Sequence, residues 1–502
     1  MIPVAQRTGS GSFLPTTGLS GTFSISLSRH PRRHREAPLD EDPRSNMTQQ
    51  STAPRTTRRM ITVLAGSLVA ASALAACAPG SSSTTNTHTG EISTDVAAAG
   101  DVTIKVSDFW GGTEGEWMDD LIARFEDTYP NVTIERTQED WGQLTSTLNL
   151  QLAENDGPDI ATANNGWSSL GTLAKGGLVL NLDPYADAYG WDDVIPSTIA
   201  RQNEFTTDFS TIGSGSLFST PVSRVSLIGI YYNTAKLDEL GIDPPTTLDE
   251  LEAAAAKAKS AGEIPFAYGS QDSPTALLLA LQALYGTADE INDFTYGDTS
   301  VSADDIGLLE AAEKAEEWNE KGWLTPDHEG IDYQTAVANF LDGKGLFRFE
   351  YTGSLGLTDE QQGDFGYIQL PQVSGDGTVG VGAAPAAMVI SSKSENPDVA
   401  AAFLDFLMSE DAAQASADHG LIPLLADADI PADAATLQSE AAGAAALGES
   451  DGFVPYFDWT SATMLDTLTQ QLQMLYAGQT SPQDLVDAVQ ADRDAFLADL
   501  AQ

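Results

Sequence analysis

The fold is decided by residues 101–167, which open with the alternating stretch Val102-Thr-Ile-Lys-Val106. Alternation of apolar and polar residues is typical of a strand with one buried face. Two more short strands are expected at Asn131-Val-Thr-Ile-Glu135 and Gly157-Pro-Asp-Ile-Ala161. Apolar residues recur at helical spacing between the strands: Trp117, Met118, Leu121, Ile122, Phe125, Leu144, Leu148 and Leu152. Strands that alternate with helices predict parallel βαβ units, with helices on both faces of the sheet.

Polar and aromatic residues follow each of these strands. In parallel sheets of this kind, ligands bind beyond the carboxyl ends of the strands. The candidate ligand residues at these ends are Trp110, Glu114, Trp141, Asn164 and Asn165. Each has a structural alternative, since a tryptophan can fill a core, a glutamate can begin a helix and an asparagine pair can form a turn.

Several short sequence motifs occur along the chain in the order found in a known protein family. They are Gly157-Pro-Asp-Ile160, 178–182, Gly229-Ile-Tyr-Tyr-Asn233, Pro245-Thr-Thr-Leu-Asp-Glu-Leu251, Phe340-Leu-Asp-Gly-Lys344, Phe365-Gly-Tyr-Ile-Gln-Leu-Pro371, Asn396-Pro-Asp-Val-Ala-Ala-Ala-Phe-Leu404 and Gly420-Leu-Ile-Pro423. With this order over 101–502, the chain resembles the extracellular solute-binding proteins of ABC importers, family 1, which include the maltose-binding-like proteins.

The resemblance implies an α/β, two-lobed periplasmic-binding-protein-like fold. Each lobe is expected to be a mainly parallel sheet flanked by helices, and crossing segments form the hinge. Lobe I is expected at 101–221 and 379–429, and lobe II at 222–378 and 430–502. The ligand would lie in the cleft between the lobes.

Candidate ligand residues also occur in the second half of the chain. Arg224 lies near the expected hinge, where it either pairs with an acid or holds ligand hydroxyls. Other candidates follow expected strands of lobe II: Tyr268, Asp272, Glu350 and Tyr351. Where the family often has a Gly-Ser-Trp-like phrase, this chain has Gly353-Ser-Leu355, so Tyr351 would supply the aromatic plate instead.

The segment Phe453-Val-Pro-Tyr-Phe-Asp-Trp459 resembles a late aromatic segment of the family. A sugar presents hydroxyls that donate and accept hydrogen bonds, and an apolar ring face that stacks on an aromatic side chain. Trp459 is therefore the leading stacking candidate. The alternative is that it packs beneath the last helices.

A short apolar run ends in the only cysteine, Cys77. Arg55, Arg58 and Arg59 precede an apolar run from Met60 to Ala75, an arrangement typical of a secretory signal. The run is shorter than the ~20 residues that a membrane span needs. Leu74-Ala-Ala-Cys77 resembles the lipobox of bacterial lipoproteins, which implies cleavage before Cys77 and its lipidation. We expect 1–76 to be a leader and 77–100 a flexible tether rich in Ser, Thr, Gly and Ala.

The chain is strongly acidic, with a net charge of −49. Residues 1–76 hold nine Lys and Arg and four Asp and Glu, so the rest has a net charge of −54. This excludes nucleic acid as a partner, because binding to phosphate relies on basic residues. With no cysteine after Cys77, the mature chain has no disulfide framework or Cys-based zinc site, and we expect no metal or cofactor.

No nucleophile elbow, His-Glu-x-x-His or Walker motif occurs, so we do not expect an enzyme. The predicted function is that of a monomeric, lipid-anchored component on the outer face of the cytoplasmic membrane. It would capture a carbohydrate and deliver it to the membrane permease of an ABC importer. The alternatives are a binder of a polyol, glycerophosphodiester or peptide-like solute, an extracellular glycoside hydrolase, and a structural surface lipoprotein.

Overall fold

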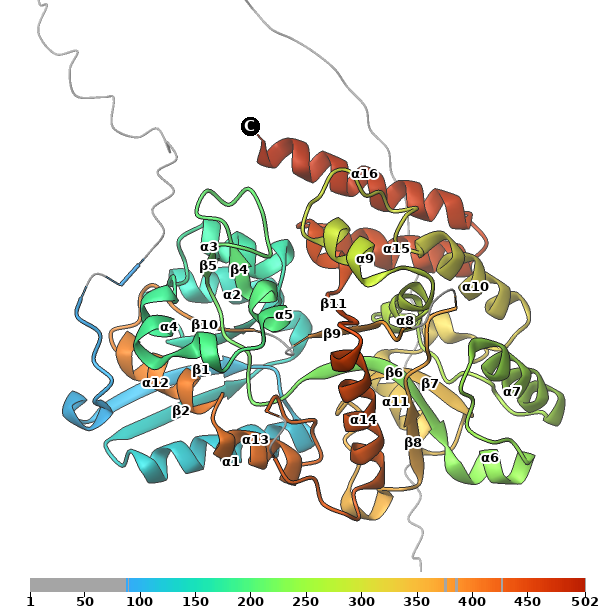
Figure 1. Ribbon diagram of the computed structural model, residues 1–502, viewed down its shortest axis with the longest axis horizontal. Helices are drawn as coiled ribbons and strands as arrows, with labels where there is room; N and C mark the ends of the chain where they lie inside the picture. The colour runs from blue at the N-terminus through green and yellow to red at the C-terminus, as the bar shows by residue number, and fades with distance from the viewer. Residues whose placement is uncertain (1–86, 89, 374–376, 384–386, 426–427, 502) are drawn as a thin grey trace, which may run out of the picture. The chain divides into compact units, whose positions relative to one another are not determined.

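The computed structural model describes residues 87–88, 90–373, 377–383, 387–425 and 428–501 (Figure 1). The predicted leader, Cys77 and the first part of the predicted tether lie outside these residues. Within them, no helix is both long enough and apolar enough to cross a membrane.

The first sheet is built from the stretch that opens the ordered chain. Its strand order is β10-β3-β1-β2. β1 (Val102–Asp108) pairs in parallel with β2 (Val132–Gln138) and β3 (Ile160–Ala163), which confirms the predicted βαβ units. β10 (Ala387–Ile390) adds an antiparallel edge to β3. All four residues of β3 are buried, as expected for a strand covered on both faces.

The second sheet has the order β11-β9-β6-β7, with β8 also paired to β6. β6 (Ser226–Asn233) is antiparallel to β7 (Phe347–Tyr351), β8 (Phe365–Ile368) and β9 (Gly380–Ala383), while β11 (Phe453–Val454) runs parallel to β9. The α/β prediction is confirmed, but a mainly parallel second sheet is wrong. The central strand β6 has antiparallel partners only, and Phe266 makes isolated parallel bridges to Phe347 of β7 and to Leu324.

Helices cover both sheets. Those packed on or near the first sheet are α1 (Gly112–Thr128), α2 (Trp141–Ala153), α3 (Thr172–Lys175), α4 (Asp183–Tyr189), α5 (Ser197–Ala200), α12 (Pro397–Phe406) and α13 (Glu410–Asp418), with the short hairpin β4 (Glu204–Phe205) and β5 (Ser216–Leu217). The others are α6 (Thr234–Leu240), α7 (Leu248–Ala261), α8 (Thr275–Tyr285), α9 (Ala288–Thr295), α10 (Leu308–Glu320), α11 (Tyr333–Leu341), α14 (Ala435–Glu449), α15 (Met464–Tyr476) and α16 (Pro482–Leu500).

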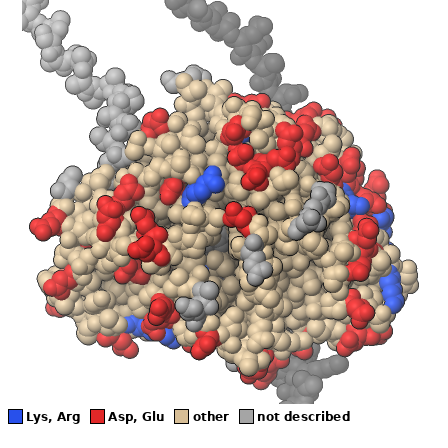
Figure 2. All heavy atoms as spheres, in the orientation of Figure 1, with Lys and Arg blue, Asp and Glu red and all other residues tan. Residues whose placement is uncertain are grey.

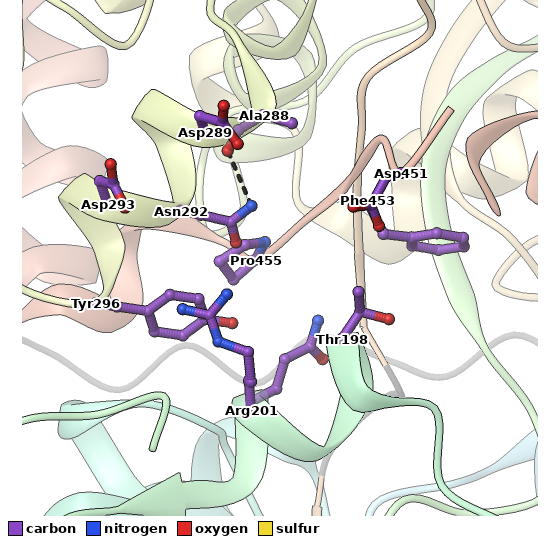
Figure 3. A pocket seen from close by; sticks show the side chains of 11 residues that line it. Thr198, Arg201, Ala288, Asp289, Asn292, Asp293, Tyr296, Asp451, Phe453 and Pro455 are labelled. Carbon is purple, nitrogen blue, oxygen red and sulfur yellow. Dashed lines mark hydrogen bonds between the residues drawn. The ribbon is translucent and has the colours of Figure 1, made fainter. Parts of the chain in front are cut away.

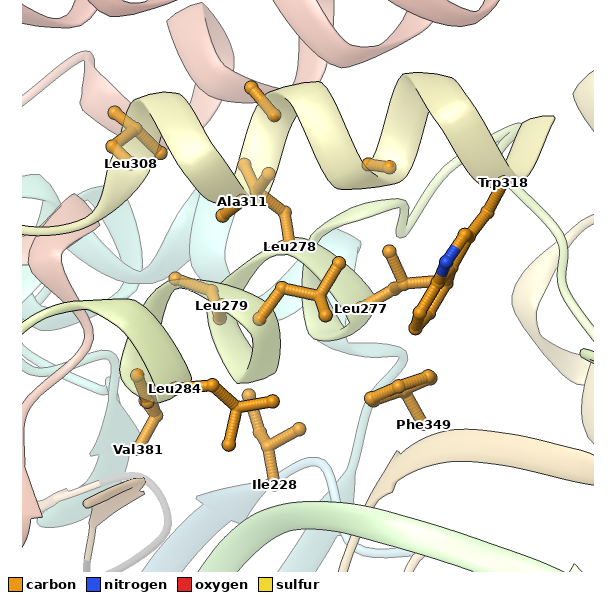
Figure 4. Close-up of a cluster of buried hydrophobic side chains, with 14 of the residues drawn as sticks. Ile228, Leu277, Leu278, Leu279, Leu284, Leu308, Ala311, Trp318, Phe349 and Val381 are labelled. Atoms are coloured by element: carbon orange, nitrogen blue, oxygen red, sulfur yellow. The ribbon is translucent and has the colours of Figure 1, made fainter. Parts of the chain in front are cut away.

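Each sheet has a hydrophobic core of its own. In the second, α8 presents Leu277, Leu278 and Leu279 between α10 and the sheet, where Trp318 and Phe349 also meet (Figure 4). α8 is apolar nearly all round because it lies between helices and strands, which is typical of a buried helix. The first core gathers side chains of β1, α1 and α12. A third buried cluster beside the first sheet also takes in Tyr296, Phe496 and Leu500 from the second half of the protein.

The end of the predicted tether differs from the expectation. Val96 is buried against the first core, and the Asn131 side-chain amide donates to the carbonyls of Val96 and Gly100 at 2.9 and 2.8 Å. His88, within the predicted tether, lies with its ring 6.0 Å from that of Tyr185. Residues 90–100 are thus part of the folded body, because a buried apolar side chain and two satisfied carbonyls hold them there.

Candidate ligand site between the two sheets

The loop after β1 is fixed by a buried carboxylate. Asp108 accepts from the Trp110 backbone N–H at 3.0 Å and from two guanidinium nitrogens of Arg136, each at 2.7 Å. Trp110 is fully buried and packs edge-on against Trp117, with ring centroids 5.3 Å apart. The structure therefore places Trp110 beneath the loop, in the core, and not at its surface.

Trp141 begins α2 and is half-buried. Its ring lies edge-on to Phe109, with the centroids 4.7 Å apart. Phe109 also neighbours the Trp110 ring at 5.2 Å, so an aromatic cluster supports this end of the first sheet. Trp141 keeps an accessible edge that is compatible with the predicted ligand contact.

The loop after β3 meets a segment from the far end of the chain. Gly166 has a φ of +78°, and a Cβ added there would lie 2.6 Å from the Cα of Trp459. Glycine alone permits both the left-handed backbone and this approach. Asn165 is buried and its Nδ2 donates to Gln202 O and Asn203 Oδ1 at 3.2 and 3.0 Å, so its amide organises the loop. Asn164 is half-buried beside it.

A row of aromatic side chains extends from the second sheet to this glycine. Tyr351, at the end of β7, lies 6.2 Å from Tyr456, and Tyr456 lies 5.2 Å from Trp459 in the helical turn Phe457–Thr460, as measured between ring centroids. Trp459 is only 2% exposed. The structure thus brings together the carboxyl end of β3, the end of β7 and the late aromatic segment. The sequence analysis placed candidate ligand residues in each of these three segments.

Arg224 and Glu114 join the two halves as an ion pair. Arg224 Nη2 lies 2.6 Å from Glu114 Oε1, and the guanidinium carbon is 5.7 Å from the Trp117 ring centroid. Arg224 is 3% exposed, yet its Nε and Nη1 have no hydrogen-bond partner within the described chain. Buried donors without partners are costly, so these two atoms favour a bound water or ligand oxygen.

Asp458 is a further candidate that our sequence analysis did not name. It is 5% exposed and precedes Trp459 in the turn Phe457–Thr460. Burial raises its pKa to about 7. At neutral pH its carboxyl group can therefore accept or donate a hydrogen bond, which matches the dual character of a sugar hydroxyl. The signal that could have found it is its position inside the quoted aromatic segment.

A second buried acid lies near Arg224. Tyr231 OH donates to Glu440 Oε1, while Oε2 has no partner among the described residues. Burial raises the Glu440 pKa to about 8. A cavity of about 10 Å³, the size of one water, separates Glu440 from Gly353 and Leu421. This carboxyl group is too enclosed to meet a solute directly.

Two other predicted ligand residues already make hydrogen bonds to side chains and backbone groups within the second half of the protein. Glu350 accepts from Arg348 Nε at 2.8 Å, Arg348 Nη2 at 2.5 Å and the Tyr351 backbone N–H at 2.8 Å. Tyr268 OH donates to Pro274 O at 2.7 Å and lies 3.2 Å from Tyr476 OH. Both side chains are buried with their polar atoms satisfied, so the structure gives them supporting roles.

Asp272 lies at the surface. Its Oδ1 accepts the backbone N–H of Tyr333 at 2.8 Å, which anchors the first turn of α11. A ligand contact at Asp272 stays a prediction.

Comparisons with known proteins agree with this architecture. The sequence pattern described as bacterial extracellular solute-binding protein matches residues 110–414. An ABC transporter extracellular-binding protein from Pyrococcus horikoshii is 24% identical over 343 residues, which cover 66% of this chain and 73% of that protein. The multiple sugar-binding protein of Streptococcus mutans is 26% identical over 205 residues, 39% of this chain and 49% of that protein.

The fold also matches a solved structure. A chitin oligosaccharide binding protein superposes with a TM-score of 0.67 and 20% identity, over 80% of this chain and all of that one. Such a match shows the two-lobed α/β fold, which confirms the predicted architecture. With its two sheets and a sequence match over more than half its length, the chain belongs to the bacterial extracellular solute-binding proteins.

Proposed function

We propose that the protein captures a carbohydrate between its two lobes and passes it unchanged to the permease of an ABC importer. The observation that carries the proposal is the aromatic row ending at Trp459 and Gly166, with Asp458 beside it. An aromatic plate flanked by a carboxyl group and by unpartnered guanidinium N–H groups offers what a sugar needs: a stacking face, an acceptor and donors.

The names of relatives support the carbohydrate class. The Streptococcus mutans relative is named a multiple sugar-binding protein, and the structural match is named a chitin oligosaccharide binding protein. Asp and Glu dominate the face of the protein in Figure 2, where Lys and Arg are few. An anionic solute such as a glycerophosphodiester would meet an unfavourable field there.

The mechanism we propose is ligand-driven closure of a monomer. The ion pair of Arg224 with Glu114 and the contact of Trp459 with Gly166 both join residues on opposite sides of the hinge. A solute that contacts both lobes shifts the protein toward the closed form only to the extent that it binds this form more tightly than the open form. The closed surface is then what the permease would recognise.

We place the lobe boundary at the crossing segments. One crossing joins β5 to β6. The other joins β9 to β10, so β9 lies in the second sheet and the change of lobe falls after 383 instead of at 379. The isolated bridge between Arg224 and Pro423 marks a third segment beside the first. Apart from this shift, the proposed lobes keep the predicted limits.

Thermal unfolding tests the carbohydrate class. The purified chain would be melted alone and with monosaccharides, oligosaccharides, polyols, glycerophosphodiesters and peptides. A ligand at ~100 times its Kd adds about 2.7 kcal/mol to the stability of the native state, so Tm rises by several degrees. We expect this with at least one carbohydrate, recovered chemically intact. A rise only with another class refutes the carbohydrate proposal, and hydrolysed sugar refutes capture without chemistry.

We also propose that the chain is anchored through acyl groups on Cys77, on the outer face of the cytoplasmic membrane. The support is the run Leu74-Ala-Ala-Cys77 after an apolar segment. Cells fed a labelled fatty acid are expected to label the protein and to retain it in the membrane fraction. Cys77→Ser is expected to remove both the label and the retention, because two or more acyl chains are what give stable anchoring. Label that persists in Cys77→Ser would disprove the anchor.

A further inference from the structure

The last helix of the chain, α16, holds the segment that follows the helical turn Phe457–Thr460, which we call the aromatic turn. Asp492 lies in this helix, and its carboxylate accepts hydrogen bonds from three hydroxyl groups. Ser461 donates to Oδ1, while Thr463 and Thr467 donate to Oδ2 at 2.9 and 2.6 Å. An ionised carboxylate only accepts hydrogen bonds, and its two oxygens have lone pairs enough for three donors.

Thr463 does not cap the helix that it precedes. It is the N-cap residue of α15, a position where a threonine side chain typically accepts a backbone N–H of the first turn. Its side chain makes no such capping bond and donates to Asp492 of α16. The hydroxyl of Ser461, a fully buried residue, accepts the Thr463 backbone N–H at 3.2 Å. The link between the aromatic turn and α15 is therefore arranged around Asp492 and departs from the usual helix start, as is expected where function competes with local preference.

The packing of α15 on α16 has an apolar basis of its own (Figure 1). Leu468 of α15 and Val489 of α16 belong to the same buried cluster. Ser461 and Thr463 precede α15, so their bonds to Asp492 hold the end of the aromatic turn. Hydrogen bonds to a charged acceptor are stronger than those between neutral groups, which suits a bond that must fix a position.

The aromatic turn is held on its other side by α9. Thr460 Oγ1 donates to the carbonyl of Phe294, in the last turn of that helix, at 3.3 Å. Figure 3 shows Pro455, where the chain enters the turn, beneath residues of α9 with which it lines a small cavity. Contacts with α9 thus hold the beginning of the turn, and Asp492 holds its end.

The position of Trp459 in this turn has little tolerance. A Cβ added at Gly166 would lie 2.6 Å from the Trp459 Cα, so the two backbones already approach as closely as a glycine permits. A movement toward the glycine would produce a clash. A movement away by ~0.5–1 Å would lose a quarter to a half of the dispersion attraction at that contact. The placement of the indole therefore depends on what holds the turn.

We propose that Asp492 is a positioning residue for solute binding and acts through Trp459. Its three hydroxyl donors fix the end of the aromatic turn, so the indole keeps its place beside Gly166 before any solute arrives. A side chain that is ordered in advance loses less conformational freedom when the ligand binds, and the affinity is correspondingly higher. Asp492 itself makes no contact with the solute in this scheme. The inference rests on the proposed capture of carbohydrate at Trp459.

Hydrogen exchange and ligand affinity, both measured on the purified chain, test the proposal. In Asp492→Ala without ligand, we expect amides in 457–463 to exchange at least about ten-fold faster and those in 468–475, within the apolar helix pair, to change less than about two-fold. Affinity for the carbohydrate that gives the largest rise in Tm is expected to fall at least about five-fold. Asp492→Asn is expected to restore both quantities to within about two-fold, because its amide still accepts a hydroxyl and can donate to others.

A second variant keeps the test sharp if Asp492→Ala folds poorly. Thr463→Val retains the shape of an exposed side chain, removes one donor and costs no helix cap. It is expected to change exchange and affinity in the same directions by about three-fold. Asp487→Ala is the matched control, since Asp487 is exposed on the same helix and accepts only from Gln483 of α16, at 3.0 Å. We expect it to change neither quantity by more than about two-fold.

The two measurements separate this inference from the proposed function. Unchanged exchange in 457–463, or faster exchange with unchanged affinity, would overturn the role of Asp492 while capture of carbohydrate stands. An equal loss of affinity in Asp487→Ala would overturn it as well. If no carbohydrate binds the parent chain, the proposed function fails and this role fails with it.

Discussion

Trp459→Ala is expected to abolish the rise in Tm that a carbohydrate gives, through a loss of affinity of at least about 30-fold. A buried tryptophan at the centre of a contact surface typically contributes 2 kcal/mol or more to binding, and 1.4 kcal/mol is a factor of ten. Trp459 has that position, since its ring follows those of Tyr351 and Tyr456 and its backbone touches Gly166. The measurement is calorimetric titration with the carbohydrate that gives the largest shift.

The substitution also removes a large side chain from a packed region, which costs about 3–5 kcal/mol of stability. Trp191→Ala is the matched control. Trp191 is 1% exposed, stacks on Tyr189 and donates from Nε1 to Asp405 at 2.9 Å, all within the first half of the protein. We expect Trp191→Ala to destabilise the fold and to leave the affinity for carbohydrate unchanged. Unchanged affinity in a folded Trp459→Ala variant would remove Trp459 from the site.

Glu350→Gln is expected to lower the free energy of unfolding by about 3–5 kcal/mol, because it leaves the buried Arg348 cation without its counter-charge. The two side chains are only 1% and 6% exposed, and Arg348 donates two hydrogen bonds to Glu350 Oε2. A loss of this size is a large part of the 5–15 kcal/mol that typically holds a protein folded. Urea unfolding of the variant and the parent chain gives the difference.

Two further measurements decide what Glu350 does. The double variant Arg348→Met, Glu350→Gln is expected to recover part of the loss, since no buried charge is then left unpaired. Ligand affinity of folded Glu350→Gln is expected to stay close to that of the parent. If affinity falls sharply while stability hardly changes, Glu350 contacts the ligand directly, as the sequence first suggested.

The first sheet could be predicted because its signals are local. Apolar and polar residues alternate in Val102–Asp108 and Val132–Gln138, and apolar residues recur at helical spacing between these two segments. These patterns predicted two strands and the helix that connects them. The antiparallel edge strand β10 could not be predicted in this way. Its pairing with β3 joins residues more than 200 positions apart, and no local pattern records such a partner.

The approach of the loop after β3 to the segment 453–459 agrees with the sequence analysis, whereas the ligand contacts stay predictions. Aromatic and acidic side chains there serve equally well in a core or in a ligand site, so Trp110 and Tyr268 were indistinguishable from Trp459 before their contacts were known.

The distant pairing of β10 with β3 has a consequence for the making of the protein. Ribosomes add about 5–20 residues per second, so β3 waits roughly 10–45 s before residues 387–390 emerge to complete the sheet. Until then β3 pairs with β1 alone, and its other edge has no partner strand.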